Sequence, residues 1–383
     1  MVHIVNMQRE LKDGASFALQ LRMRRRLKKL SLRDLSAALG GAVSHEMLSR
    51  YEKGIAKPRP EVYEQLCDLL EIQESAAYTP VIAMDSVKFR RSRWNLPQKE
   101  LAAIKALAVE HCNRYLKLEC LVGECLEWQS PFTRAEQRRL VRVMKESKEK
   151  TALMEEMADS LRVRWQLGSG PITSLSTLLE RKGVLICELP FLNNRLDGFS
   201  FVHEGKPIIC VADWLNRNPA RKRMTLAHEL GHILFPEVDA DMDSDKEYCI
   251  MRFAGALLMP QAEVRAALGS EPRRELPLYM LLELKHYFGI SLVGLMARAM
   301  QLKIIDWEQY SDYNRRFFKQ FYAQPAEKQL EDLEPGHPYS VADASSRFST
   351  LVSRAVSTGV IDARAAVERF GVQSDETLVR NLL

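Results

Sequence analysis

The chain has 383 residues, of which 46% are hydrophobic and 27% are charged. These proportions are those of ordinary globular domains and exclude disordered and fibrous proteins, and the length predicts two or three folded units. The formal net charge is only +5, but between Met1 and Pro60 there are 13 Lys and Arg against 5 Asp and Glu, which directs attention to phosphate-containing partners at that end.

The first predicted elements are short amphipathic helices over residues 15–29, 32–39, 44–52 and 61–70. Ser31 and Ser44 stand where helix N-caps are expected, and Pro60 is suited to a first helical turn. A Gly40-Gly41 pair ends the second helix. We therefore expect a compact all-α domain within residues 1–80.

The first of these helices is strongly basic. Two interpretations are open: a solvated helix face, or a surface that contacts phosphate. The motif that follows it favours the second. The basic residues are Arg22, Arg24, Arg25, Arg26, Lys28 and Lys29.

Residues 30–37 (LSLRDLSA) and 43–54 (VSHEMLSRYEKG), with Pro58, resemble the lambda-repressor-like (XRE) helix-turn-helix. The resemblance implies that the second helix of the motif lies in the major groove of duplex operator DNA. Its matching DNA-contacting positions are Ser44, His45, Met47 and Arg50. An apolar residue such as Met47 is more often part of a core, so both roles stay open for it.

The middle of the chain, residues 81–168, is predicted as a helical connector. Helical patterns run over 98–127 and 133–167, with a break at 128–131. The sequence GSGP at 168–171 is the clearest flexible segment of the chain and predicts a domain boundary.

The next predicted domain, residues 169–308, differs from the connector because it mixes helices with β-type runs. A helix over 175–182 precedes three β-type runs, after which a longer helix covers 219–234. Further helices are predicted at 246–257, 261–268, 278–288 and 292–302. The expected fold class is α+β, mostly α, with one small sheet.

The helix predicted at 219–234 carries the sequence His-Glu-Leu-Gly-His at 228–232. Histidines four residues apart lie on one face of a helix and can bind one ion, here His228 and His232. Zinc lowers the pKa of a coordinated water towards about 7, and Glu229 can accept its proton during attack on a peptide carbonyl. The competing interpretation is a helix with two incidental histidines.

A catalytic zinc site needs a third protein ligand. The acidic stretch downstream offers too many candidates to choose from by spacing alone. An EF-hand is excluded, because Lys246 and Arg252 replace the glycine and glutamate that such a calcium loop requires. The candidates are Glu237, Asp239, Asp241, Asp243, Asp245 and Glu247.

Residues 221–232 (RKRMTLAHELGH) and 253–260 (FAGALLMP) resemble the ImmA/IrrE metallopeptidases over about residues 175–305. The resemblance implies a gluzincin-like zinc endopeptidase with Glu247 as the third ligand. The chain departs from the family at Ile250 and Met251, where small residues are usual, and at Pro236, where histidine is frequent.

The combined prediction is a DNA-binding transcription regulator that carries a zinc-dependent endopeptidase domain. The resemblance implies a protein substrate, a helix-turn-helix repressor, in a stress, mobile-element or toxin-antitoxin context. The alternative is a non-proteolytic regulator or antitoxin whose zinc domain senses a signal or binds a partner such as a toxin. The presence of Glu229 favours the enzyme, and we expect a homodimer.

Some features remain open after these assignments. The sequence pattern at 281–302 is similar to a helix-turn-helix, but the favoured interpretation is two packing helices that complete the peptidase domain. His203, Tyr248 and His286 are candidates to polarise a substrate carbonyl or to serve structure. Residues 309–383 form a C-terminal region of unknown role, with a last helical pattern at 347–364.

No basic segment followed by an apolar core stands near the start, and no run of about 18 apolar residues occurs. We therefore expect a cytoplasmic protein without membrane contact. The 7 cysteines form no C-x-x-C pair, so we expect reduced, mostly buried thiols.

Overall fold

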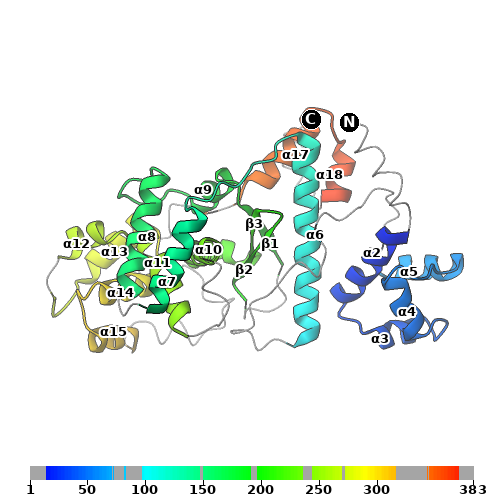
Figure 1. Ribbon diagram of the computed structural model, residues 1–383, viewed down its shortest axis with the longest axis horizontal. Helices are drawn as coiled ribbons and strands as arrows, with labels where there is room; N and C mark the ends of the chain where they lie inside the picture. The colour runs from blue at the N-terminus through cyan, green and yellow to red at the C-terminus, as the bar shows by residue number, and fades with distance from the viewer. Residues whose placement is uncertain are drawn as a thin grey trace. The chain divides into compact units, whose positions relative to one another are not determined.

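The computed structural model describes residues 14–70, 72, 82, 97–146, 150–190, 196–235, 244–269, 272–315, 343 and 345–370 (Figure 1). Its fold is α+β and mostly α, as predicted. The described residues form two compact units. The first contains those up to Gly123 together with those from Val360 onwards, and the second contains those from Glu124 to Gly359.

The first unit begins with the predicted group of short helices. Ser31 caps the second of them in a capping box with Asp34, and Ser44 caps the third by accepting a hydrogen bond from the Met47 N–H group at 3.3 Å. These caps explain why both helices start where the sequence predicts. The helices are α2 (Gly14–Leu27), α3 (Leu32–Ala38), α4 (His45–Glu52) and α5 (Pro60–Leu70).

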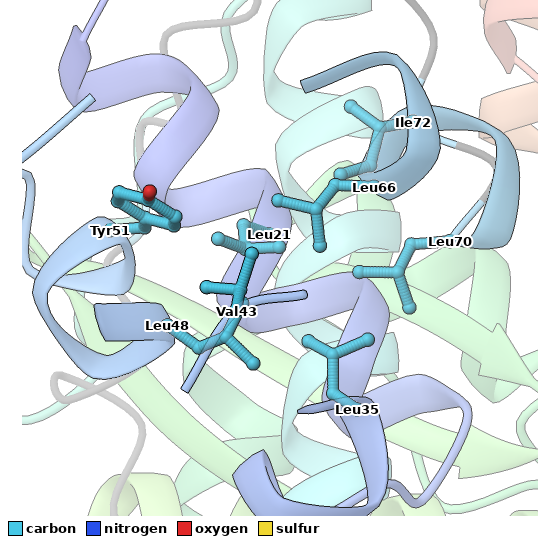
Figure 2. Packing of buried hydrophobic residues seen from close by; sticks show 8 residues of the cluster. All are labelled: Leu21, Leu35, Val43, Leu48, Tyr51, Leu66, Leu70 and Ile72. Atoms are coloured by element: carbon cyan, nitrogen blue, oxygen red, sulfur yellow. The ribbon is translucent and has the colours of Figure 1, made fainter. Parts of the chain in front are cut away.

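One apolar cluster joins these four helices (Figure 2). Its members come from every helix and from the α3–α4 turn, so no helix of the group buries its apolar face alone. They are Leu21, Leu35, Val43, Leu48, Tyr51, Leu66, Leu70 and Ile72.

The first unit also contains α6 (Gln98–Val122) and α18 (Ala363–Phe370). Helix α6, which the sequence placed in a connector, packs against α2. Arg24 of α2 forms an ion pair with Glu110 of α6 at 3.5 Å, and Arg25 pairs with Glu52 at 2.5 Å. Two of the basic residues expected to contact phosphate thus also hold the unit together.

The second unit contains a three-stranded sheet in the order β1-β3-β2. Strand β1 (Leu185–Leu189) pairs in parallel with β3 (Lys206–Ala212). Strand β2 (Gly198–His203) pairs with β3 in the antiparallel sense through a two-residue turn, which leaves β2 at an edge. The three strands occupy the predicted positions.

Helices pack against this sheet and against one another. Helix α10 (Pro219–Leu234) packs against β2 and β3, and α11 (Ser244–Leu258) packs against α10 and α8 (Lys150–Arg164). The others are α7 (Arg134–Glu146), α9 (Leu175–Arg181), the 3-10 helix η2 (Asp213–Arg217), α12 (Gln261–Leu268), α13 (Leu278–Phe288), α14 (Leu292–Gln301), α15 (Trp307–Tyr313) and α17 (Arg347–Ser357).

Helices α13 and α14 correspond to the segment with helix-turn-helix texture. Arg298 of α14 is 1% exposed and donates a hydrogen bond to the Met259 carbonyl at 3.0 Å. Because α14 turns this side chain into the interior, the structure favours the interpretation of α13 and α14 as two packing helices. Within the described residues no single helix is long and apolar enough to span a membrane, and α13 and α14 meet that test only as a pair bent by 101°.

Part of the C-terminal region is fixed inside the second unit. The buried carboxylate of Asp343 accepts hydrogen bonds from the Ser176 N–H group at 2.8 Å and from Ser174 Oγ at 3.1 Å, and it pairs with Arg223 of α10 at 3.0 Å. Helix α17 follows in the same unit, whereas α18 belongs to the first. The predicted C-terminal region is therefore shared between the two units.

Candidate metal centre and DNA-binding helix

Helix α10 presents the two histidines of the 228–232 sequence on one face. It starts at Pro219 behind an Asn218 cap, and its four-residue spacing brings His228 Nε2 and His232 Nε2 to 3.0 Å from each other. His232 is 3% exposed. The two ring nitrogens thus face a common point.

Gly231 lets α11 approach this helix closely. A Cβ atom at Gly231 would lie 3.0 Å from Ile250 Cγ2 and 3.1 Å from Phe253 Cδ1, both on α11. Ile250 is one of the departures noted in the sequence, and its side chain packs here against the glycine. This contact brings Glu247, one turn earlier on α11, next to the histidines.

Glu247 completes a three-residue group with His228 and His232. Its Oε2 lies 3.3 Å from His228 Nε2, and its Oε1 lies 3.4 Å from His232 Nε2. The hydrogen bonds of His228 and then His232 hold the pKa of the Glu247 carboxyl well below its usual range, although burial opposes them. The carboxylate is therefore ionised and available as a ligand.

The spacing of these donor atoms fits a zinc ion. Tetrahedral coordination with bonds of about 2.0–2.1 Å separates neighbouring ligand atoms by about 3.4 Å. The three measured separations are 3.0, 3.3 and 3.4 Å. Two imidazoles and one carboxylate are also a donor set found at catalytic zinc, with a fourth position left for water or substrate.

Glu229 lies beside this group, but the contact that holds its side chain comes from strand β2. Its side chain is buried, and Ser200 Oγ on β2 donates a hydrogen bond to its Oε2 at 2.7 Å. A carboxylate oxygen of Glu229 and one ring nitrogen from each histidine lie within 4.8 Å of one another. Sequence reasoning missed Ser200, whose only signal was a polar residue between two phenylalanines in a predicted strand.

The other candidates of the sequence stand at other positions on β2, α11 and α13. Side chains alternate along a strand, so His203 lies on the face of β2 opposite Ser200. Tyr248 follows Glu247 and is 46% exposed, and His286 is half-buried on α13. Pro236 and the acidic residues Glu237, Asp239, Asp241 and Asp243 lie outside the described residues.

Helix α4 carries the positions predicted to contact DNA. Arg50 is exposed, and His45 presents a side chain that is 43% exposed and lies 2.9 Å from a Glu46 carboxylate oxygen. Ser44 caps the helix. Met47 is half-buried and packs against the apolar cluster, which favours the core role over base contact for this residue.

Comparison with protein families gives two matches. Residues 16–77 match a model described as a helix-turn-helix domain, and residues 179–300 match one described as an IrrE N-terminal-like domain of the M78 peptidases. No curated protein and no solved structure matched the chain. The chain joins a helix-turn-helix domain to an ImmA/IrrE-type domain, as the sequence predicted. It is a regulator with a metallopeptidase-like domain.

Proposed function

We propose that the second unit is a zinc-dependent endopeptidase in which His228, His232 and Glu247 bind the metal and Glu229 is the general base. The observation that carries this proposal is the group of three donor atoms 3.0–3.4 Å apart, with an ionisable carboxylate beside them. The competing interpretation, a helix with two incidental histidines, gives no reason for the Glu247 carboxylate to lie beside both imidazole rings.

Zinc, when bound, supplies a Lewis acid that polarises a carbonyl and acidifies a coordinated water. Glu229 accepts a proton at its carboxylate and returns it to the leaving amine. Ser200 orients that carboxylate, because its hydroxyl fixes one of the two oxygens. Burial of Glu229 keeps bulk water from competing for it.

We infer that the first unit brings this activity to operator DNA. Ser44, His45 and Arg50 stand at or near the exposed side of α4, where a helix-turn-helix meets base edges. The resemblance to ImmA/IrrE proteins favours a repressor-type regulatory protein as substrate, in a stress, mobile-element or toxin-antitoxin setting. We also propose that the protein forms a homodimer and that, in a toxin-antitoxin setting, it binds a toxin.

Metal content and proteolysis test the site together. The wild type should bind about one zinc ion per chain, and His228→Ala or His232→Ala should lose it, because one imidazole and one carboxylate hold zinc weakly. Glu247→Ala should weaken zinc binding less completely. His45→Ala, in the other unit, is the control and should keep full occupancy. Full zinc occupancy in His228→Ala would refute the assignment.

Glu229→Gln separates the enzyme from a sensor. This variant should keep zinc and DNA binding, because Glu229 is not a ligand, and should lose cleavage of the chain itself and of repressors encoded nearby by orders of magnitude. An unchanged regulatory response in Glu229→Gln cells would instead establish a non-proteolytic regulator or antitoxin.

A further inference from the structure

Helix α7 of the second unit exposes a row of arginines. Its other side is anchored, since Leu140 is 3% exposed and Gln137 donates a hydrogen bond to the Leu234 carbonyl at the end of α10, at 3.0 Å. At about 100° per residue, Leu140 lies nearly opposite the middle of the exposed row. The exposed side chains, called the arginine ridge below, are Arg134, Arg138, Arg139 and Arg142.

No ion pair among the described side chains neutralises the arginine ridge. Glu136 of the same helix is already engaged, because it pairs with Arg164 of α8 at 2.5 Å and accepts a hydrogen bond from the Thr133 N–H group at 2.7 Å. None of the four ridge arginines has an ion-pair partner in the part of the chain that the structure describes.

The spacing of the arginine ridge differs from that of an ordinary solvated helix face. Such faces place opposite charges four residues apart, which stabilises the helix. Here Arg134 and Arg138, and again Arg138 and Arg142, put like charges at that spacing, which destabilises the isolated helix, and only Arg142 has an acid, Glu146, four residues further on. A bound polyanion would remove the repulsion.

We propose that the arginine ridge is a second DNA-contacting surface, which binds backbone phosphates of duplex DNA. All four residues are arginine, whose planar guanidinium suits bidentate contact with phosphate oxygens. From Arg134 to Arg142 the helix extends about 12 Å, the axial length of three to four nucleotides of one strand. The helix-turn-helix domain of the same chain supplies the duplex at high local concentration.

This inference goes beyond the proposed function and needs neither zinc nor proteolysis. It also requires no particular arrangement of the two units, because phosphate contacts carry no sequence information and can form along any exposed duplex. An acidic protein segment is the other partner that four arginines suit. The DNA-binding domain in the chain favours DNA.

The test measures binding of the full-length chain to a 30-base-pair duplex of arbitrary sequence at several salt concentrations. R134Q/R138Q/R139Q/R142Q should bind at least about tenfold more weakly at low salt, and the slope of log affinity against log salt should become shallower by about 2 to 4, since each lost phosphate contact removes about 0.9. All four side chains are exposed, so the fold should persist, and zinc content and circular dichroism check this.

The control variant R181Q/R217Q/R274Q/K303Q removes the same charge from four exposed, scattered positions of the same unit. It should change the affinity less than about twofold, because scattered charges act only at long range and are screened by salt. Equal slopes for the ridge and control variants would overturn the proposal. So would loss of binding to poly-glutamate by the ridge variant with DNA binding unchanged, which would assign the arginine ridge to an acidic protein.

Discussion

The hydroxyl group of Ser200 and the carboxylate of Glu229 form a direct hydrogen-bonded link between the sheet and the candidate metal centre. Ser200 comes from the edge strand β2 and Glu229 from α10, and their oxygens lie 2.7 Å apart in a buried environment. A hydrogen bond to a charged group is worth about 1.5–3 kcal/mol, enough to select one carboxylate orientation.

Replacement of Ser200 should therefore affect turnover and not metal binding. We expect Ser200→Ala to keep zinc and to lower the rate of proteolysis by about tenfold or more through kcat, because the base is no longer held in place. Ser200→Thr retains the hydroxyl and should recover much of that loss. The measurements are metal content and steady-state kinetics, and loss of zinc from Ser200→Ala would mean that the serine supports the ligands instead.

At the level of residues, the sequence predicted which side chains would gather but not how they are supported. The four-residue spacing predicted that His228 and His232 share a face, and the family resemblance indicated Glu247. Neither could show that Gly231 makes room for Ile250, or that Ser200 reaches Glu229. Both contacts join segments far apart in the chain, and periodicity describes only neighbours along one element.

Among the helices and strands, α6 is an element whose end and packing were predicted poorly by the hydrophobic periodicity. The pattern predicted a helix over 98–127, and the helix ends at Val122. It also has buried residues on several sides, including Ala103, Val109 and Tyr115, whereas a connector would bury only one stripe. Its contacts with α2 and α18 depend on residues distant in sequence, so its membership in the first unit was not predictable.

Helix α6 should make the first unit sensitive to acid. Burial first, and then the charge of Arg114, lower the pKa of His111 to about 4. Since 6.5 is the ordinary value for an unfolded histidine, the unfolded state binds a proton first as the pH falls. Stability is thus fully present above pH 6.5 and is lost progressively towards pH 4, by about 2 kcal/mol at pH 5.

Hydrogen exchange of α6 amides at pH 7.5 and 5 measures this effect. Protection should fall more in the wild type than in His111→Gln, where no titrating ring remains. The exposed His45 serves as the control, and His45→Gln should behave as the wild type does. Equal pH dependence in His111→Gln and the wild type would contradict the assignment to His111.

On the scale of the whole molecule, the C-terminal segment is a structural part of the metallopeptidase-like unit. Asp343 and Arg223 are 0% and 1% exposed at their side chains, and Arg223 stands on the same helix as the two histidines. Removal of one partner from a buried ion pair leaves the other charge without compensation, at a cost of about 3–5 kcal/mol.

We therefore expect Asp343→Ala to destabilise the second unit by about that amount in urea unfolding and to weaken zinc retention during the same titration. The exposed pair of Arg315 and Asp312, 3.6 Å apart, offers a control, and Asp312→Ala should change stability by less than about 1 kcal/mol. If both variants unfold at the same urea concentration, the buried pair contributes nothing beyond a surface pair.

Among the described residues, the order of the chain places the second unit between two parts of the first. The chain leaves the first unit after Gly123 and re-enters it at Val360, and each crossing adjoins a glycine with φ of 73°, Gly123 and Gly359. Because both connections run through the second unit, a cut in the chain anywhere between Glu124 and Gly359 would separate α18 covalently from helices α2 to α6.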